Sequence, residues 1–157
     1  MNNLFEEDKA MSRGFEVVSK FEDKNVKLPE RKTEKSAGYD FHAIQNVIID
    51  PGKTHIFETG IKAYMMDDEV LEIYIRSSLA FKRGLMLLNC TAIIDSDFYG
   101  NTDNDGHILI GMKNISSQPV SVASGEAIAQ GIFKKYLTID GDNVKIKRTG
   151  GIGSTGK

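Results

Sequence analysis

The sequence has a single cysteine, Cys90, among its 157 residues. One cysteine cannot form an intrachain disulfide, which excludes a small disulfide-stapled fold and fits a reducing compartment. Only three histidines are present, His42, His55 and His107, and none has a second His or Cys at ligand spacing. A dedicated zinc site of the usual kind is therefore not expected.

A surplus of charge is also missing. Lys and Arg number 20 against 22 Asp and Glu, so the formal net charge is −2 and no general nucleic-acid-binding surface is expected. No apolar run approaches the ~20 residues of a membrane span, and the polar N-terminus MNNLFEEDKAMSRG lacks the layout of a signal peptide. We expect a cytoplasmic protein that binds neither membranes nor nucleic acid and meets an anionic ligand with a local cluster.

A sustained helical period of 3.6 residues is absent, and only residues 77–84 could form a short helix. Short runs rich in β-branched and aromatic residues alternate instead with turn sequences, which predicts strands. The predicted strands are 15–21, 46–50, 55–65, 70–75, 85–89, 91–95, 107–114, 119–123 and 127–136. The length suits one core, so we expect one all-β domain, a sandwich, jelly roll or barrel, over residues 14–146. A flexible extension, 1–13, would precede it, and an arm, 147–157, would follow.

The last nine residues, TGGIGSTGK, contain most of a P-loop pattern, with Gly151, Gly156 and Lys157 at the required spacing. A P-loop also needs a helix behind it, and no residues remain to build one. The arm is therefore predicted to be a mobile, glycine-rich segment of backbone donors with nothing to pack against in the free chain.

Two stretches place anion-binding groups at the ends of strands. In IRSSLAFKRG (75–84) an apolar strand runs into Arg76, Ser77 and Ser78, whose guanidinium and hydroxyls suit phosphate. In SGEAIAQGIFKKY (124–136), Gln130 interrupts a strand of small and apolar residues. Each stretch alone fits an ordinary strand end or a solvent-facing side chain equally well.

Acids stand beside aromatics in two further stretches. Asp40 lies between Tyr39 and Phe41 in AGYDFHA (37–43), and Asp95 follows the apolar run of LNCTAIIDSDFYGN (88–101). A carboxylate at a strand mouth can act as a general base, and a nearby aromatic can pack on a ring. Taken together, the five stretches provide the parts of a site that binds a polyphosphate with a ring attached and delivers water to it.

The order and wording of the five stretches resemble the trimeric dUTPases, over roughly residues 14–157. The resemblance implies a jelly-roll subunit and a homotrimer whose active sites are each assembled from all three subunits. It implies Mg²⁺-dependent hydrolysis of dUTP to dUMP and pyrophosphate, which limits uracil incorporation into DNA and supplies dUMP for dTMP synthesis. It also implies that the glycine-rich arm crosses to a neighbouring subunit and closes over bound nucleotide as a lid.

The resemblance assigns roles by position. Asp40 would organise the magnesium and its waters, with the metal held mainly by the triphosphate. Asp95 would orient and deprotonate the attacking water. The phosphate contacts would come from Arg76, Ser77, Ser78 and Gln130, and the uracil edge would meet Asn89 and the hairpin backbone at Ile94, with Phe98 under the deoxyribose. The arm would contribute Arg148, Gly150, Gly151, Ile152, Gly153, Ser154 and Thr155.

Several positions depart from the usual family pattern. Phe98 stands where Tyr is usual, Ala127 where a basic residue is common, and Ile152 where Phe is usual. The arm's usual Arg aligns with Lys147, while Arg148 follows it, so either could reach phosphate. The stretch 101–107, NTDNDGH, looks a few residues longer than usual.

Two other functions share these features. A dCTP deaminase resembles dUTPases in subunit and trimer but needs a Glu near the third motif. After that motif this chain offers Asp103 and Asp105, and the next Glu along the chain is Glu126. A regulatory nucleotide-binding protein could use the same site to signal to an unknown protein partner, through residues 1–13 or 101–107. The presence of Asp95 favours an enzyme, since a pure binder needs no general base.

Overall fold

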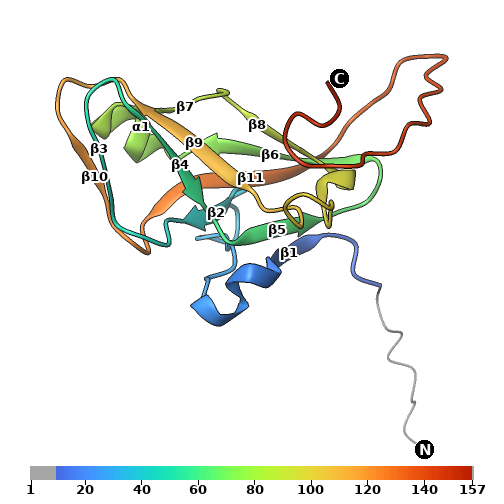
Figure 1. Ribbon diagram of the computed structural model, residues 1–157, viewed down its shortest axis with the longest axis horizontal. Helices are drawn as coiled ribbons and strands as arrows, with labels where there is room; N and C mark the ends of the chain where they lie inside the picture. The colour runs from blue at the N-terminus through green and yellow to red at the C-terminus, as the bar shows by residue number, and fades with distance from the viewer. Residues whose placement is uncertain (1–9, 157) are drawn as a thin grey trace, which may run out of the picture.

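The fold is built from β-strands, as Figure 1 shows for a computed structural model that describes residues 10–156. This part of the chain has eleven strands, one short α-helix and two 3-10 helices. The strands are β1 Gly14–Val17, β2 Tyr39–His42, β3 Val47–Ile49, β4 Thr54–Glu58, β5 Ile61–Tyr64, β6 Glu69–Ile75, β7 Leu85–Leu87, β8 Ala92–Asp95, β9 Leu109–Asn114, β10 Val120–Val122 and β11 Ala127–Lys135. The all-β prediction is confirmed.

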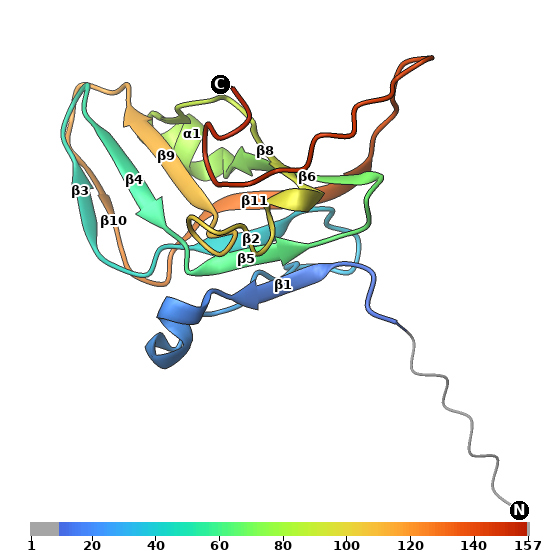
Figure 2. The same ribbon diagram turned by 45° about the vertical axis from the view of Figure 1, so that its right-hand side comes forward.

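The largest sheet has the order β2-β11-β6-β8, and every pair in it is antiparallel. A second sheet has the order β4-β9-β7, and two strand pairs, β1-β5 and β10-β3, complete the set. Figure 2 shows β4 and β9 running across one side of the molecule, with β2, β11 and β6 on the other. Consecutive strands often belong to different sheets, as the jelly-roll prediction requires.

The core lies between the two larger sheets because alternate side chains of their strands point inward. In β6, Leu71 and Ile73 are fully buried while Glu72 is half-buried, and in β9 the same alternation buries Ile110 and Met112. These side chains belong to one buried cluster. Burial of such apolar area, worth ~25 cal/mol per Å², is the main term that holds the sheets together.

Several strands are shorter than predicted, and the structure differs most from the prediction at two of them. The strand predicted at 15–21 ends at Val17, and Ser19–Lys24 form a 3-10 helix, η1, that buries Phe21. The strand predicted at 55–65 is divided between β4 and β5, because Gly60 adopts a positive φ of 72°. The short helix expected at 77–84 is present as α1, Ser77–Arg83.

The residues next to the domain can be compared with the predicted N-terminal extension, 1–13, and the predicted arm, 147–157. Residues 1–9 of the predicted extension and Lys157 of the arm lie outside the described residues. Arg13, at the inner end of the extension, donates hydrogen bonds of 2.5 and 3.0 Å to the buried carboxylate of Glu69. The mobility of residues 1–13 stays a prediction. Among residues 10–156, no helix is long and apolar enough to cross a membrane.

His107 ties β9 to the turn before β5. Its imidazole is 3% exposed, and its Nε2 accepts a hydrogen bond of 2.9 Å from the Gly60 backbone N–H. That nitrogen must be unprotonated to accept the bond. Burial, together with the charge of Lys20, lowers the pKa of His107 below its ordinary value.

We expect acid to weaken the fold through His107. Because its pKa is lower in the folded chain, the unfolded chain binds the proton first as pH falls below about 6.5, and stability then falls by at most ~1.4 kcal/mol per pH unit. His107→Gln keeps an acceptor for Gly60 and does not titrate. Denaturant unfolding at pH 7.5 and 5.5 should therefore show a smaller loss for His107→Gln than for the unchanged protein. Equal losses in the two proteins would contradict this role.

Candidate active site

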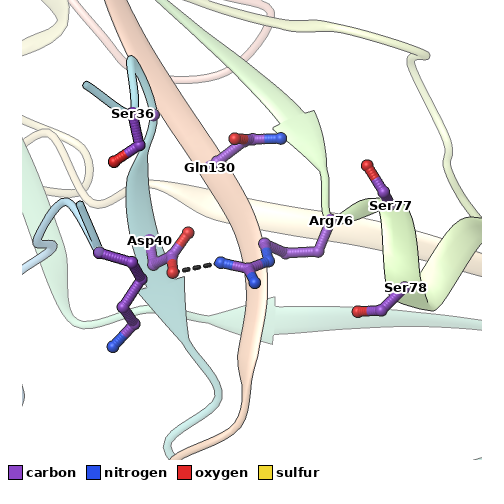
Figure 3. Close-up of a pocket in the computed structure, with 8 residues that line it drawn as sticks. Ser36, Asp40, Arg76, Ser77, Ser78 and Gln130 are labelled. Carbon is purple, nitrogen blue, oxygen red and sulfur yellow. Dashed lines mark hydrogen bonds and ion pairs between the residues drawn. The ribbon is translucent and has the colours of Figure 1, made fainter. Parts of the chain in front are cut away.

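A pocket rich in anion-binding groups lies where β2 and β11 meet the start of α1 (Figure 3). Antiparallel pairing sets Gln130 of β11 opposite Asp40 of β2 on one side and Tyr74 of β6 on the other. Arg76 directly follows β6 and precedes α1. The cavity has a volume of about 420 Å³ and is lined by Lys32, Ser36, Gly38, Asp40, Arg76, Ser77, Ser78 and Gln130. We call it the anion pocket.

An ion pair fixes the charged groups of the anion pocket. The Asp40 side chain is 3% exposed, and its carboxylate accepts a short hydrogen bond from the Arg76 guanidinium. A buried carboxylate without such a partner would be strongly destabilising, so the pair holds the guanidinium in place as well as the acid. The rest of the guanidinium remains available, since the Arg76 side chain is 32% exposed.

The first turn of α1 adds hydroxyls to the same pocket. Ser77 and Ser78 are exposed, and the first hydrogen bonds of the helix are those from Leu79 and Ala80 to the Arg76 carbonyl. Helix geometry leaves the earlier N–H groups without intrahelical partners. The anion pocket thus combines a guanidinium, two hydroxyls and backbone donors.

A second pocket lies at the mouth of β8. It has a volume of about 280 Å³, with Asn89, Ile94, Asp95 and Phe98 in its wall. Four further residues of the domain line it, Ala92, Ile93, Ile108 and Leu109, as do four arm residues, Arg148, Ile152, Gly153 and Thr155. A wall that combines apolar side chains with polar groups suits a flat ring with a polar edge, so we call it the base pocket.

Arg148 closes one side of the base pocket. Its Nη2 donates to Asp95 Oδ2 at 2.7 Å, its Nε donates to Asp97 Oδ1 at 2.8 Å, and its guanidinium lies 5.6 Å from the centre of the Phe98 ring. The hydrogen bond and charge of Asp97, together with Asp95, raise the pKa of Arg148 above its ordinary value. Lys147 is exposed, so in this structure Arg148 is the basic residue of the arm that reaches the site.

The prediction that the arm has nothing to pack against is wrong. Gly150 and Gly151 are buried, Gly151 N–H donates to Asp103 at 2.7 Å, and Thr102 donates to the Thr149 carbonyl at 2.8 Å. These partners lie in the stretch 101–107, far from the arm in the sequence, so no local pattern indicated the contact. Ile152 is 73% exposed, so it forms an edge of the base pocket rather than its floor.

The predicted site residues thus fall into two groups within one chain. Asp95 is paired with Val70 of β6, whereas Arg76 comes six residues after Val70 along the same strand direction. At ~3.3 Å per residue the two pockets are about 20 Å apart along β6. No residue lines both pockets. One chain therefore brings Asp95, Asn89, Phe98 and the arm together, but keeps Arg76 and its neighbours apart from them.

Sequence reasoning missed part of the anion pocket. Lys32, Ser36 and Gly38 line it, although none was predicted as a site residue. Gly38 lies in the stretch AGYDFHA, two residues before Asp40, and that position was a signal for it. A Cβ at Gly38 would lie 2.4 Å from Gln130 Oε1 and 2.9 Å from Gln130 Cβ, so a larger residue would force Gln130 to shift. Lys32 carries no such local signal, because it lies in an exposed basic run.

Metal-binding groups are sparse around both pockets. Among the described residues no three His, Cys, Asp or Glu side chains are grouped as ligands for a metal ion. In the anion pocket Asp40 is a lone carboxylate that already carries a guanidinium. This donor set fits a hard cation held mainly by phosphate oxygens and water, and does not fit an all-protein cage.

Comparison with known proteins gives a consistent result. The sequence profile of the dUTPase family matches residues 24–156. A deoxyuridine 5'-triphosphate nucleotidohydrolase of Lactococcus lactis is 47% identical over 146 residues, which cover 92% of this chain and 97% of the relative. The corresponding nucleotidohydrolase of Nautilia profundicola is 33% identical over 135 residues, which cover 83% of this chain and 91% of that relative.

Solved structures agree with the sequence relatives. The crystal structure of a dUTPase from Streptococcus mutans has a TM-score of 0.75 and 43% identity, and the match covers 82% of this chain and 99% of that one. A dUTPase of Staphylococcus bacteriophage 80alpha, at 20% identity and a TM-score of 0.68, shares the fold over 86% of this chain and 97% of that chain. The profile match over most of the sequence and the identity to these relatives show that this chain belongs to the dUTPase family.

Proposed function

We propose that this protein hydrolyses dUTP to dUMP and pyrophosphate. A water oxygen attacks the α-phosphorus, the bond from that phosphorus to the α–β bridging oxygen breaks, pyrophosphate leaves, and the proton of the water passes to a carboxylate. The observation that carries the proposal is the position of Asp95, with a 54% exposed side chain at the mouth of the base pocket. A nucleotide whose ring fills this pocket presents its phosphates to that carboxylate.

The base pocket supplies the specificity. Asn89 stands exposed on the turn before β8, where it can pair with the polar edge of uracil, and the reversed donor and acceptor pattern of cytosine would not match. Phe98 is 7% exposed, and its rigid ring under the sugar leaves no room for a 2′-hydroxyl. The backbone that hydrogen-bonds uracil would lie too close to the base to admit the methyl group of thymine.

Arg148 serves two groups in this mechanism. In this structure it holds Asp95 and Asp97 by hydrogen bonds. A guanidinium binds phosphate as readily as carboxylate, so the phosphates of a bound nucleotide compete for the same donors. Arg148 thereby orients Asp95 before substrate arrives and neutralises phosphate charge afterwards.

The two pockets become one site in an assembly of chains. We propose a homotrimer in which the base pocket of one subunit meets the anion pocket of a neighbour, because about 20 Å along β6 separates them within a chain. Arg76, Ser77, Ser78 and Gln130 of the neighbour would then bind the β- and γ-phosphates, with Ser77 at the leaving oxygen. Apolar side chains 78–96% exposed in the segment between β11 and the arm, at Leu137, Ile139, Val144 and Ile146, offer surface for such a contact.

The arm lies on its own chain in this structure. The extended segment 136–147 leaves the body and the chain then returns toward β8, as the red end of the ribbon shows in Figures 1 and 2. Four arm residues line the base pocket there. If the segment reached across to a neighbour instead, the arm would make the same contacts on that neighbour's base pocket, as in any domain swap. The crossing of the arm, which the family resemblance implies, keeps the site unchanged.

Magnesium belongs to the proposal as a companion of the substrate. Bound to the triphosphate, Mg²⁺ neutralises charge on the phosphates and favours the leaving of pyrophosphate. Asp40 would contact its water shell from the anion pocket. The proposed reaction removes a uracil nucleotide from the DNA precursor pool and supplies dUMP for dTMP synthesis. The proposed location is the cytoplasm.

The alternatives have less support. Of the acids near the third motif, Asp105 is paired with Lys62, while Asp103 accepts the Gly151 N–H. The candidate Glu126 is paired with Arg83. None of the three lines the base pocket, so a deaminase would lack the acid that activates its water. A purely regulatory binder would leave Asp95 without a task.

Substrate choice is the direct test. With Mg²⁺ and each of dUTP, dCTP, dTTP and UTP in turn, we expect pyrophosphate and a nucleoside monophosphate from dUTP alone. The measurement is pyrophosphate release together with identification of the monophosphate. Silence with all four nucleotides, although dUTP raises the melting temperature, would instead identify a binding protein; dUMP from dCTP would identify a deaminase.

Removing the general base should separate binding from turnover. We expect Asp95→Asn to bind a non-hydrolysable dUTP analogue within about threefold of the unchanged protein while kcat falls by ~10²-fold or more, because general bases contribute that much. Asp97→Asn is the matched control, since it loses the same charge next to the same guanidinium. Calorimetry and steady-state rates provide the two readouts. Equal rate losses in both variants would remove Asp95 from its role.

Site sharing can be tested by mixing inactive subunits. Arg76→Gln lacks the guanidinium but keeps a donor for buried Asp40, and Asp95→Asn lacks the base. When the two proteins are unfolded together and refolded, random trimers should recover about a quarter of the normal activity, because a shared site then has an even chance of each intact residue. If both residues came from the same chain, no mixture would exceed the activity of its two components.

A further inference from the structure

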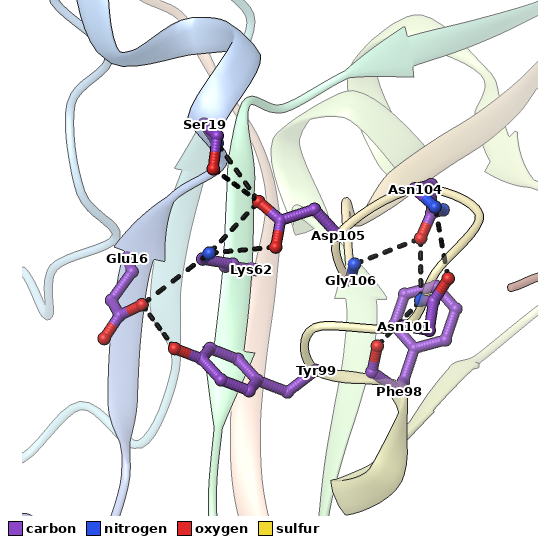
Figure 4. A network of polar contacts seen from close by, with 9 residues as sticks. All are labelled: Glu16, Ser19, Lys62, Phe98, Tyr99, Asn101, Asn104, Asp105 and Gly106. Carbon is purple, nitrogen blue, oxygen red and sulfur yellow. Dashed lines mark hydrogen bonds and ion pairs between the residues drawn. The ribbon is translucent and has the colours of Figure 1, made fainter. Parts of the chain in front are cut away.

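The hairpin 101–107, longer than the family pattern leads one to expect, has no role in the mechanism above. Its inner side is held by Asn101, whose amide donates to the Phe98 carbonyl at 2.8 Å and to Asn104 at 2.7 Å. The Asn101 side-chain oxygen accepts the N–H groups of Asp103 and Asn104, each at 3.1 Å. One amide side chain thus fixes the shape of the hairpin and attaches it to Phe98 of the base pocket (Figure 4).

The outer side of the hairpin is anchored to the N-terminal strands. Asp105 accepts hydrogen bonds of 3.1 Å from the Ser19 backbone and hydroxyl and from Lys62 of β5. Tyr99, just before the hairpin, donates to Glu16 of β1 at 2.7 Å, which raises the pKa of Tyr99 to about 12. These contacts with β1, η1 and β5, drawn in Figure 4, leave the hairpin little freedom to move relative to the core.

The exposed tip of this anchored hairpin contacts the arm. Thr102 Oγ1 donates to the Thr149 carbonyl at 2.8 Å, and Asp103 Oδ2 accepts the Gly151 N–H at 2.7 Å. A Cβ on Gly150 would lie 2.4 Å from the same carboxylate oxygen. The arm therefore fits against the hairpin only because residue 150 is glycine.

We propose that the hairpin 101–107 is a docking platform for the arm, and that Thr102 and Asp103 are positioning residues that hold the arm closed over the base pocket. The inference rests on the proposed function, in which the closed arm covers bound dUTP. The inference assigns different partners to the backbone N–H groups of the arm. In the docked arm the Gly151 N–H binds Asp103, so residues 153–155 are the ones left to contact phosphate. The inference also gives the additional residues of the hairpin a use.

Amide exchange reads docking without any substrate. We expect the Gly151 amide, which is donated to Asp103 in the docked arm, to exchange with deuterium about fivefold to tenfold faster in Asp103→Ala, since a hydrogen bond to a charged group is lost. Asp103→Asn keeps an oxygen acceptor and should exchange within about twofold of the unchanged protein. Asp140→Ala, which removes the same charge from the exposed segment before the arm, is the control.

A second substitution tests the contact itself. Gly150→Ala should disturb docking on its own, because its methyl group meets the Asp103 carboxylate. In the Asp103→Ala background that carboxylate is gone, so Gly150→Ala should add less than twofold to the exchange rate. With dUTP, kcat/KM should fall by about fivefold in Asp103→Ala and stay within about twofold in Asp103→Asn.

The outcomes keep the two proposals apart. Unchanged Gly151 exchange in Asp103→Ala, or an equal change in Asp140→Ala, would overturn the docking role even if the protein hydrolyses dUTP. Independent, multiplying effects of the Asp103 and Gly150 substitutions would overturn it too. Failure of the unchanged protein to hydrolyse dUTP, with exchange behaving as expected, would overturn the proposed function and leave docking intact.

Discussion

The antiparallel pairing of β6 with its two neighbours, β11 and β8, fixes the positions of Arg76 and Asp95, one charged group in each pocket. Because β11 pairs with β6 on one side and with β2 on the other, Gln130 and Asp40 lie beside the end of β6 that carries Arg76. Pairing with β8 sets Asp95 opposite Val70, at the other end. Because a strand is extended by ~3.3 Å per residue, the two ends of β6 cannot approach each other. The separation of the two pockets is thus a property of the sheet, and in the proposed trimer contact between subunits would bring them together.

The arm relates to the body in a different manner. Its described residues, 147–156, have no strand pairing. They are held by the side chains of Arg148, Thr102 and Asp103, and two glycines without side chains allow the close contact. Such contacts are individually weak, which suits a segment that must open to admit substrate and release product. The core, in contrast, depends on extensive apolar burial and does not need to move.

The sequence was sufficient for the features that depend on local patterns. Short apolar runs rich in β-branched and aromatic residues predicted β6 and β9, which the structure confirms, and residues 77–84 predicted the short helix α1. It was not sufficient where long-range contacts decide. The hydrogen-bond partner of Gly151 lies 48 residues earlier in the chain, in a hairpin whose shape depends on the Asn101 amide. Likewise nothing local marks Lys32 as a wall of the anion pocket, because its position follows from the path of a loop.

The exposed apolar segment between β11 and the arm affects the solubility of a single, unassembled chain. Leu137, Ile139, Val144 and Ile146 present β-branched and leucine side chains to water in an extended stretch, with neither a sheet nor a core to cover them. Extended apolar segments of this kind are the usual starting points for unspecific association between chains. In the proposed trimer, assembly would therefore protect solubility as well as create the site. A newly made subunit that found its neighbours late would be exposed to aggregation for longer, so its yield would depend on the concentration at which it folds.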